Sequence, residues 1–453
     1  MTRAAPAGAP SGRDVLRDRG VVVFLVAASL SAVGMFLQAA ALGKQLYDIT
    51  NSELALGMLG LVEFAPALFL LPLTGSAADR FDRRRVSSIG LAGEVVTSVL
   101  FLFYALSEPT SGIPIFGVAL LFGISRAFVS PSIRSIPPLV APAGGLPRLM
   151  GIYSATWQVG LIVGPASSGL LYDVHPAVPY AVGAACFGLS AVAVLLVPVR
   201  RSQDRTPVEQ KPSLHHALEG LRFIRGRPVL LGAIALDLFA VLFGGAVALL
   251  PAIAEDRLHV GNVGYGWLRA APGVGAVVVA MMLAARPLRR RIGRSLLAVV
   301  AVFGAGTMVL GFTTNYVVAF GALVVLAGTD AVSVFICQTI VPLATPDHMR
   351  GRVSAVENVF IGASNEVGAF ESGVASALIG VGPAIVVGGA LTIGVVGVWS
   401  IAFPDLRDID SFDDVTVPDH SPTSASATLA DHPLLDHEVP FARTPDGEDP
   451  PPP

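Results

Sequence analysis

Twelve long apolar stretches run through the sequence, and they constrain its fold more than any other feature. A helix needs about 20 mostly apolar residues to cross a bilayer, and in hydrocarbon it satisfies its own backbone hydrogen bonds. The pattern therefore predicts an all-α membrane protein with twelve transmembrane helices. The candidate spans lie at residues 20–46, 54–74, 86–107, 113–134, 150–172, 177–199, 229–253, 262–284, 295–312, 315–341, 352–379 and 381–403.

The composition supports a membrane location. Hydrophobic residues make up 53% of the chain and charged residues only 14%, whereas soluble domains carry about a quarter charged residues. The first span is too long for the apolar core of a signal peptide and lacks a clear small-residue cleavage site. Cys186 and Cys337 both fall inside predicted spans, so we expect packing roles for them and neither a metal site nor a cofactor.

Polar segments divide the chain. A linker at 200–228 separates six spans from six, and the spacing of its apolar residues predicts an amphipathic helix on the membrane face. Residues 404–453 hold 12 of the 33 acidic residues and 2 of the 30 basic ones, and their composition predicts disorder. The expected segments are a cytoplasmic N-terminal segment 1–19, a six-helix bundle 20–199, the cytoplasmic linker 200–228, a second six-helix bundle 229–403 and an acidic cytoplasmic tail 404–453.

The loop charges predict the orientation in the membrane. Lys and Arg concentrate in cytoplasmic loops, and a cytoplasmic N-terminus places 26 of the 30 basic residues on that side. The outer loops then hold only Arg257, with Lys44 near the outer end of the first span. We therefore expect both termini in the cytoplasm. The 28 Arg against 2 Lys, with abundant Ala, Gly and Val, indicate a bacterial source, so the membrane would be the plasma (inner) membrane.

The chain also repeats itself. "EFAPALFLLPLTGSAADRFDRRR" from Glu63 aligns with "RAAPGVGAVVVAMMLAARPLRRR" from Arg269 at an offset of 206 residues. At an offset of 204, "RAFVSPSIRSIPPLVAP" from Arg126 aligns with "DAVSVFICQTIVPLATP" from Asp330. Two six-helix halves related by an axis along the membrane normal are the architecture of one large class of transporters. The repeat thus predicts two pseudo-symmetric six-helix bundles.

Several motifs resemble those of the major facilitator superfamily. "GSAADRFDRRR", between the second and third spans, resembles its motif A, with Asp82 where the family often has Gly. "GLIVGPASSG" in the fifth span resembles motif C of its drug:proton antiporters, and Arg126 is the candidate for the motif B arginine. "SNEVGAFESGVASALIG", from Ser364, resembles the enterobactin-exporter-like branch. The motif residues are Gly75, Asp79, Arg80, Arg83 and Arg84 for motif A, and Gly160, Gly164, Pro165 and Gly169 for motif C.

The resemblance implies roles for both motifs. Asp79 would face the N-terminus of the eleventh span, near residues 351–353, when the inner gate is closed. The motif A residues are the candidates for this gate, and Arg83–Arg85 would in addition anchor to anionic lipid headgroups or only determine topology. The glycines of motif C would allow close helix packing and Pro165 a bend, as in the outer seal of an exporter or in any kinked packing helix.

Ionisable residues inside the predicted spans are candidates for proton coupling or substrate contact, because each costs at least about 2.5–3.5 kcal/mol to insert. The repeat sets Glu63 against Arg269 and Arg126 against Asp330. The resemblance puts Arg126 and Asp330 on cavity-lining spans, where coupling and a static ion pair are equally open, while Glu63 and Arg269 favour structural or gating roles. For Glu94, on a peripheral span, a structural role is favoured. The candidate residues are Glu63, Arg126, Asp237, Arg269, Asp330 and Glu366.

These features predict a secondary active transporter that exports a hydrophobic drug-like or siderophore-like molecule in exchange for protons by alternating access. The alternatives are an uptake permease of the same fold and a non-transporting membrane sensor or scaffold. The sequence contains neither a Walker A motif nor a nucleophile constellation on a soluble domain, so we do not expect an enzyme. The expected partners are a small-molecule substrate, protons and the lipid bilayer, without nucleic acid, and the expected state is a monomer.

Overall fold

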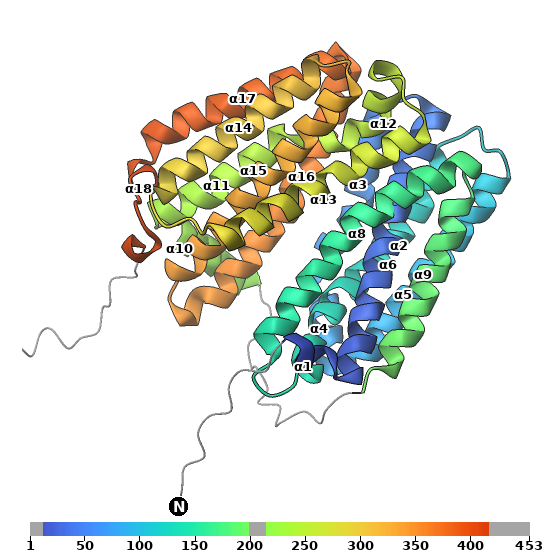
Figure 1. Cartoon of the computed structure of the whole chain (residues 1–453), viewed down its shortest axis with the longest axis horizontal. Helices are drawn as coiled ribbons and strands as arrows, with labels where there is room; N and C mark the ends of the chain where they lie inside the picture. The colour runs from blue at the N-terminus through green and yellow to red at the C-terminus, as the bar shows by residue number, and fades with distance from the viewer. Residues whose placement is uncertain (1–11, 199–213, 416–453) are drawn as a thin grey trace, which may run out of the picture. The chain divides into compact units, whose positions relative to one another are not determined.

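The computed structural model describes residues 12–198 and 214–415, and all of the long elements in these ranges are helices (Figure 1). The predictions for residues 1–11, 199–213 and 416–453 lie outside the described residues. Within the two described ranges, twelve helices have 16 residues or more. They are α2 (Arg19–Thr50), α3 (Glu53–Phe69), α5 (Arg83–Leu106), α6 (Ile113–Arg134), α8 (Leu146–Val174), α9 (Val178–Leu196), α11 (Pro228–Phe243), α13 (Asn262–Ala285), α14 (Ile292–Phe312), α15 (Tyr316–Leu343), α16 (Asp347–Ile379) and α17 (Val381–Ala402).

Shorter elements connect them. In the first half these are α1 (Gly12–Leu16), α4 (Leu71–Arg80) and α7 (Pro137–Val140). The linker contributes α10 (Leu214–Arg225). Beyond α11 the chain continues through the 3-10 turn η1 (Gly245–Leu249), α12 (Leu250–Ala252) and the π-helical turn η2 (Ile253–Arg257). The short elements α18 (Pro404–Arg407) and η3 (Phe412–Asp414) follow α17.

The helices pack as two halves with the same internal contacts. In the first half, the packed pairs are α2–α8, α2–α9, α3–α6, α5–α6 and α5–α9. In the second half, the corresponding pairs are, in the same order, α11–α16, α11–α17, α13–α15, α14–α15 and α14–α17. The protein is thus an all-α membrane protein of two pseudo-symmetric six-helix halves, as the sequence repeat predicts. The segment boundaries drawn from the sequence stay predictions.

The membrane-crossing signal differs between outer and inner helices. Nine segments of the described chain are long and apolar enough to cross a membrane. The long helices that do not meet this criterion are α3, α8 and α16, and each packs against the other half, α3 against α16 and α8 against α13. α3 misses the criterion because it has only 17 residues, and α13 meets it. A helix covered on one face by the other half needs less apolar surface than one surrounded by lipid, which explains the greater polarity of α8 and α16.

The outward faces of the peripheral helices are apolar. On α5, for example, Ile89, Val96 and Phe103 recur every seven residues and are all exposed. Contiguous exposed apolar surface of this kind is rare on soluble monomers, and a bilayer provides the environment that it needs. The side chains that turn inward from the same helix include Glu94 and Ser98, which are buried.

Glycine pairs bring the two halves into close contact. A Cβ added to Gly169 of α8 would lie 2.8 Å from the Cα of Gly266 on α13. The counterpart of Gly169 in the repeat is Gly373 of α16, which contacts Gly57 of α3 in the same way. A Cβ added to Gly373 would lie 3.1 Å from the Cα of Gly57. Small residues allow helices to approach this closely in a membrane. Both contacts lie toward the end of the bundle that carries Lys44, here called the Lys44 end; the opposite end, where α5 begins, is called the Arg83 end.

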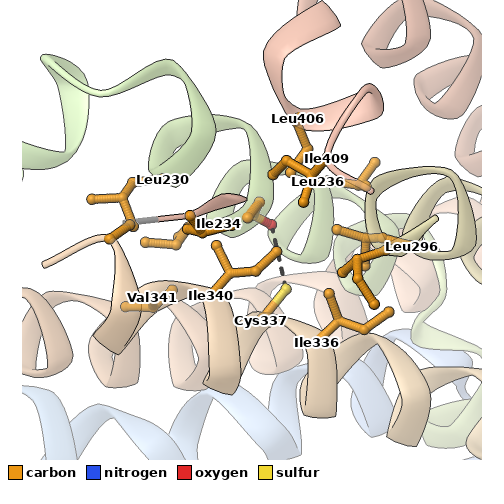
Figure 2. Close-up of a cluster of buried hydrophobic side chains, with 14 of the residues drawn as sticks. Leu230, Ile234, Leu236, Leu296, Ile336, Cys337, Ile340, Val341, Leu406 and Ile409 are labelled. Carbon is orange, nitrogen blue, oxygen red and sulfur yellow. Dashed lines mark hydrogen bonds between the residues drawn. The ribbon is translucent and has the colours of Figure 1, made fainter. Parts of the chain in front are cut away.

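The first residues of the acidic tail are folded, which corrects the prediction of disorder from residue 404 onward. Leu406 and Ile409 are buried in a cluster that contains Leu236, Leu296 and Ile336 (Figure 2). The backbone N–H of Gly293 donates a hydrogen bond to the carbonyl of Ile409, at 3.0 Å. Composition averaged over the whole tail concealed this apolar start. The same cluster contains Cys337, whose thiol lies 3.8 Å from the carbonyl oxygen of Ala233, in a packing environment.

A matched pair of substitutions on α8 tests the close packing of its helix face. A Cβ at Gly160 would lie 2.7 Å from the Cβ of Ala32 and 2.9 Å from its carbonyl carbon, whereas Gly151 on the same helix has nothing within 4 Å. We expect Gly160→Ala to destabilise the protein by about 1–3 kcal/mol through overpacking. Gly151→Ala should be neutral or stabilising, because alanine favours the helix by about 0.5–1 kcal/mol. Thermal unfolding of the purified variants measures both, and equal midpoints would contradict the packing.

Candidate functional site

Four ionisable side chains meet between the two halves. An Nη1 atom of Arg126 on α6 lies 3.9 Å from Oε2 of Glu63 on α3. Glu63 also interacts electrostatically with Arg269 on α13, and Glu366 on α16 interacts with all three of these groups. Glu366 lies against α3, since a Cβ added to Gly60 would overlap its Oε2 atom. We call Glu63, Arg126, Arg269 and Glu366 the charge network.

The network is balanced and draws on both halves. Two carboxylates and two guanidinium groups come from α3, α6, α13 and α16, one from each helix. Arg269 is held further by a hydrogen bond from its Nη1 atom to the carbonyl of Val247, at 2.8 Å. Charges buried without partners are costly, so this arrangement favours a conformer in which the halves lie together at this level. A change in the protonation of either carboxyl would alter that balance.

Three further carboxyl groups gather inside the second half. Asp237 on α11 interacts electrostatically with both Asp330 on α15 and Glu357 on α16. The hydroxyl of Ser333 donates a hydrogen bond to Asp237 Oδ1, at 3.0 Å. We call Asp237, Asp330 and Glu357 the acidic cluster. A cavity lined by Asp237 and Glu357 adjoins it, and its other walls include Leu238, Gln338, Phe360 and Ile361.

The structure thus groups the predicted charges differently from the sequence repeat. The repeat set Arg126 against Asp330, but Arg126 is paired with Glu63 within its own half and Asp330 has Asp237 as its charged neighbour. Glu63 and Arg269, the other opposed pair, do interact. Equivalent positions in two repeats lie at equal depth, but depth alone does not determine which helix faces which side chain.

A polar tie joins the halves at the Lys44 end, and the sequence analysis did not identify it. Lys44, only 8% exposed, pairs with Asp48 one turn along α2 and with Glu255 of η2, with 3.0 Å from Nζ to Glu255 Oε2. The hydroxyl of Tyr47 donates to Asp256 at 2.5 Å, and that of Tyr172 donates to Asp48 at 2.7 Å. A lysine at the end of an otherwise apolar span was the one signal in the sequence that could have revealed this tie.

The motif A arginines hold loops of their own half. Arg83 donates through Nη1 to the carbonyl of Ser135, and Arg84 does so to that of Val197, both at 2.9 Å. Asp82 caps α5 and accepts hydrogen bonds from Arg84, which hold the pKa of this carboxyl below its usual range. Gly75 lies on α4 and Arg80 at its exposed end, while the side chain of Asp79 lies outside the described part of the structure. α4 packs against α3, α5 and α6.

Motif C forms two close contacts along α8. Gly160 and Gly164 face α2, where an added Cβ at Gly164 would lie 2.9 Å from the backbone nitrogen of Leu37. Gly169 faces α13 in the other half, and the carbonyl oxygen of Pro165 lies 2.7 Å from a Cβ added to Gly266. α8 is thereby wedged between α2 and α13. Pro165 is buried within the helix, which continues through it from Leu146 to Val174.

Two six-helix halves with charged side chains gathered between them define a membrane transporter of the secondary type. The chain belongs to the major facilitator superfamily, whose family description, "Major Facilitator Superfamily", matches residues 20–369. The transporters with this fold include the nucleoside transporter NupG, which superposes with a TM-score of 0.65 at 11% sequence identity. The superposition covers 85% of this chain and 99% of the NupG chain. A bacterial homologue of the lysosomal transporter Spinster, inward-facing and unoccupied, superposes with a TM-score of 0.64 at 16% identity, over 88% of this chain and 97% of its own.

Curated relatives of the chain include drug exporters. The multidrug efflux pump Tap of Mycobacterium tuberculosis is 28% identical over 76% of this chain and 84% of its own length. The class C tetracycline resistance protein of Escherichia coli is 26% identical over 68% of this chain and 78% of its own length. These relatives support the drug:proton antiporter-like branch that the motifs indicate.

The tie at the Lys44 end can be tested by removing its central charge. We expect Lys44→Gln to weaken the contact between the halves, because Asp48 and Glu255 would then be two like charges without their shared cation. Spin labels at the exposed residues Ser107 and Thr314, in a background without Cys186 and Cys337, would report a longer and broader distance distribution. The control Lys211→Gln removes the other lysine of the chain and should leave the distribution unchanged. An unchanged distribution in Lys44→Gln would show that the tie does not hold this end together.

Proposed function

We propose that this protein exports amphipathic, cationic drug-like molecules across the bacterial plasma membrane in exchange for protons. The observation that carries the proposal is the acidic cluster with its adjoining cavity. The described residues that line the cavity include two carboxylates, aromatic and aliphatic side chains and one amide, and they include no Lys or Arg. In a conformer that widens this cavity, such a lining would suit a positively charged molecule with an apolar body. The named functions of the Tap and tetracycline resistance relatives support efflux of drugs.

The acidic cluster provides a physical basis for coupling. Three neighbouring carboxyl groups cannot all be ionised without strong mutual repulsion, so the cluster is most stable when it holds protons or a cation. Protons entering the cluster neutralise the carboxylates and release the bound cation. Loss of the protons restores the negative charge that attracts the next substrate molecule. Protons and substrate therefore compete for the same groups, which is the requirement for exchange.

Alternating access would use the two ends of the bundle. The distribution of basic residues supports a cytoplasmic location for the Arg83 end and for both termini. The Lys44 end is then the outer end, and its tie and glycine contacts would close that side of the protein. At the Arg83 end α4 packs within its own half. The described structure would correspond to the conformer open to the cytoplasm, in which a substrate can enter.

Transport into inside-out membrane vesicles tests this function. We expect an imposed proton gradient to drive uptake of a fluorescent lipophilic cation such as ethidium, and Asp330→Asn to reduce this uptake about tenfold or more, because the cluster loses one exchangeable proton. Asp405→Asn, which changes an exposed residue of α18, should transport normally. If dye uptake by Asp330→Asn depended on the proton gradient as fully as uptake by the unmodified protein, coupling through the acidic cluster would be refuted. A gradient that drives the dye outward would favour an uptake permease, and no transport of any cation would favour a sensor.

A further inference from the structure

Glu94, on α5, is a buried carboxyl group for which neither the motifs nor the proposed transport cycle provides a role. Its side chain points into the first half and is 2% exposed. Its Oε2 atom has no hydrogen-bond partner among the described residues. An ionised carboxylate with an unpaired oxygen in such a site is costly, so its charge state depends on the nearest cation. One helical turn along α5, Ser98 donates a hydrogen bond to the buried Gln38.

That cation is Arg126, and glycine contacts place its helix, α6, between α3 and α5. On one side of α6, a Cβ added to Gly123 would overlap the carbonyl oxygen of Glu63, so α6 packs directly on α3 at Glu63. On the other side, a Cβ added to Gly93 of α5 would overlap the hydroxyl of Ser125. Arg126 follows Ser125 directly, and it interacts electrostatically with both Glu63 and Glu94.

The other elements around Glu94 present no competing charge among the described side chains. α2 contributes the neutral Gln38, and α9 contains no Asp, Glu, Lys, Arg or His. The titratable groups of α9 are Cys186 and Tyr180, whose hydroxyl donates to Gln45. The sequence of α4 ends with Asp79 and Arg80, before α5 begins. The first residue of α5, Arg83, is about 16 Å along the helix axis from Glu94.

We propose that Glu94 is a second proton-binding site, located in the first half, and that it competes with Glu63 for Arg126. In one state Arg126 pairs with ionised Glu63, as in the 3.9 Å contact between them, and Glu94 holds a proton. In the other state a proton is bound to Glu63, and Arg126 turns to ionised Glu94. One proton leaves one carboxyl and one proton is bound by the other, so the net charge of the three groups does not change.

This exchange deepens the proposed transport function and rests on it for its biological purpose. Glu63 belongs to the charge network that joins the halves, whereas Glu94 lies inside one half. Moving the proton from Glu94 to Glu63 therefore takes Arg126 away from the interface and removes one negative charge from it. A buried site within one half would in this way control the contact between the halves, with α6 as the connecting element.

Infrared titration of the purified full-length protein tests the exchange without relying on transport. The carbonyl stretch of a protonated carboxyl group should titrate with pH, and Glu94→Gln should remove one such component. In Glu63→Gln, Arg126 loses its paired carboxylate and can turn to ionised Glu94, so the component from Glu94 should titrate at a pH lower by about 1 unit or more. This is at least a tenfold loss of proton affinity. Glu108→Gln, which changes an exposed loop residue, should alter neither signal.

The outcomes separate this proposal from the transport function. Repeating the titration in Asp330→Asn should give the same Glu94 component, since the acidic cluster lies in the other half. An unchanged titration in Glu63→Gln would overturn the competition, even if vesicle transport were proton-driven. If Glu94→Gln fails to fold, the titration pH of the Glu94 component in Glu63→Gln still tests the competition, because that variant leaves Glu94 in place. Loss of transport with the coupled titration intact would refute the proposed function alone.

Discussion

The constraint on which the structure depends is that an ionised side chain inside a bilayer requires a partner or an aqueous space. The charge network meets it with partners, since Glu63, Arg126, Arg269 and Glu366 compensate one another across the two halves. The acidic cluster differs, because its three carboxyl groups repel one another beside a cavity. One group of charges therefore stabilises a particular contact between the halves. The other remains electrostatically unsatisfied until it binds a proton or a cation, and a transporter needs both properties.

The glycine contacts make this electrostatic arrangement geometrically feasible. Side chains of ordinary size would hold neighbouring helices at about 8–10 Å, and the charges would then be further apart and separated by apolar atoms. Gly123 lets α6 approach the backbone of Glu63, and Gly60 provides the space into which Glu366 projects. Gly169 and Gly266 do the same for α8 and α13 at the Lys44 end. The glycines and the charged residues thus act together, because the glycines determine how closely the helices that carry the charges approach one another.

The sequence predicted the fold closely, because each helix leaves a local signal of about twenty apolar residues and the repeat relates six of them to the other six. The identities of the charged residues in the spans were also evident, since any such residue is conspicuous. Their partners were not, because the pairing of Arg126 with Glu63 depends on the rotation and tilt of α3 and α6. The Lys44 tie was missed for a related reason: Glu255 and Asp256 lie in a segment where α11 continues through 3-10 and π turns, and its register cannot be inferred from apolar periodicity. The apolar start of the tail was hidden by the acidic residues that surround it.

The differences between the two halves are as informative as their likeness. The halves share their helix contacts but place their charges differently: the first half contains Arg126 with two carboxyl groups, and the second contains the acidic cluster, Asp237 with two further carboxyl groups. A strictly symmetric protein would have equal free energies for opening toward either side, and a proton could not favour one of them. With a compensated arginine in one half and an uncompensated acidic cluster in the other, adding one proton changes the two halves by different amounts. In the proposed transport function, that inequality would give the binding of a proton a directional effect.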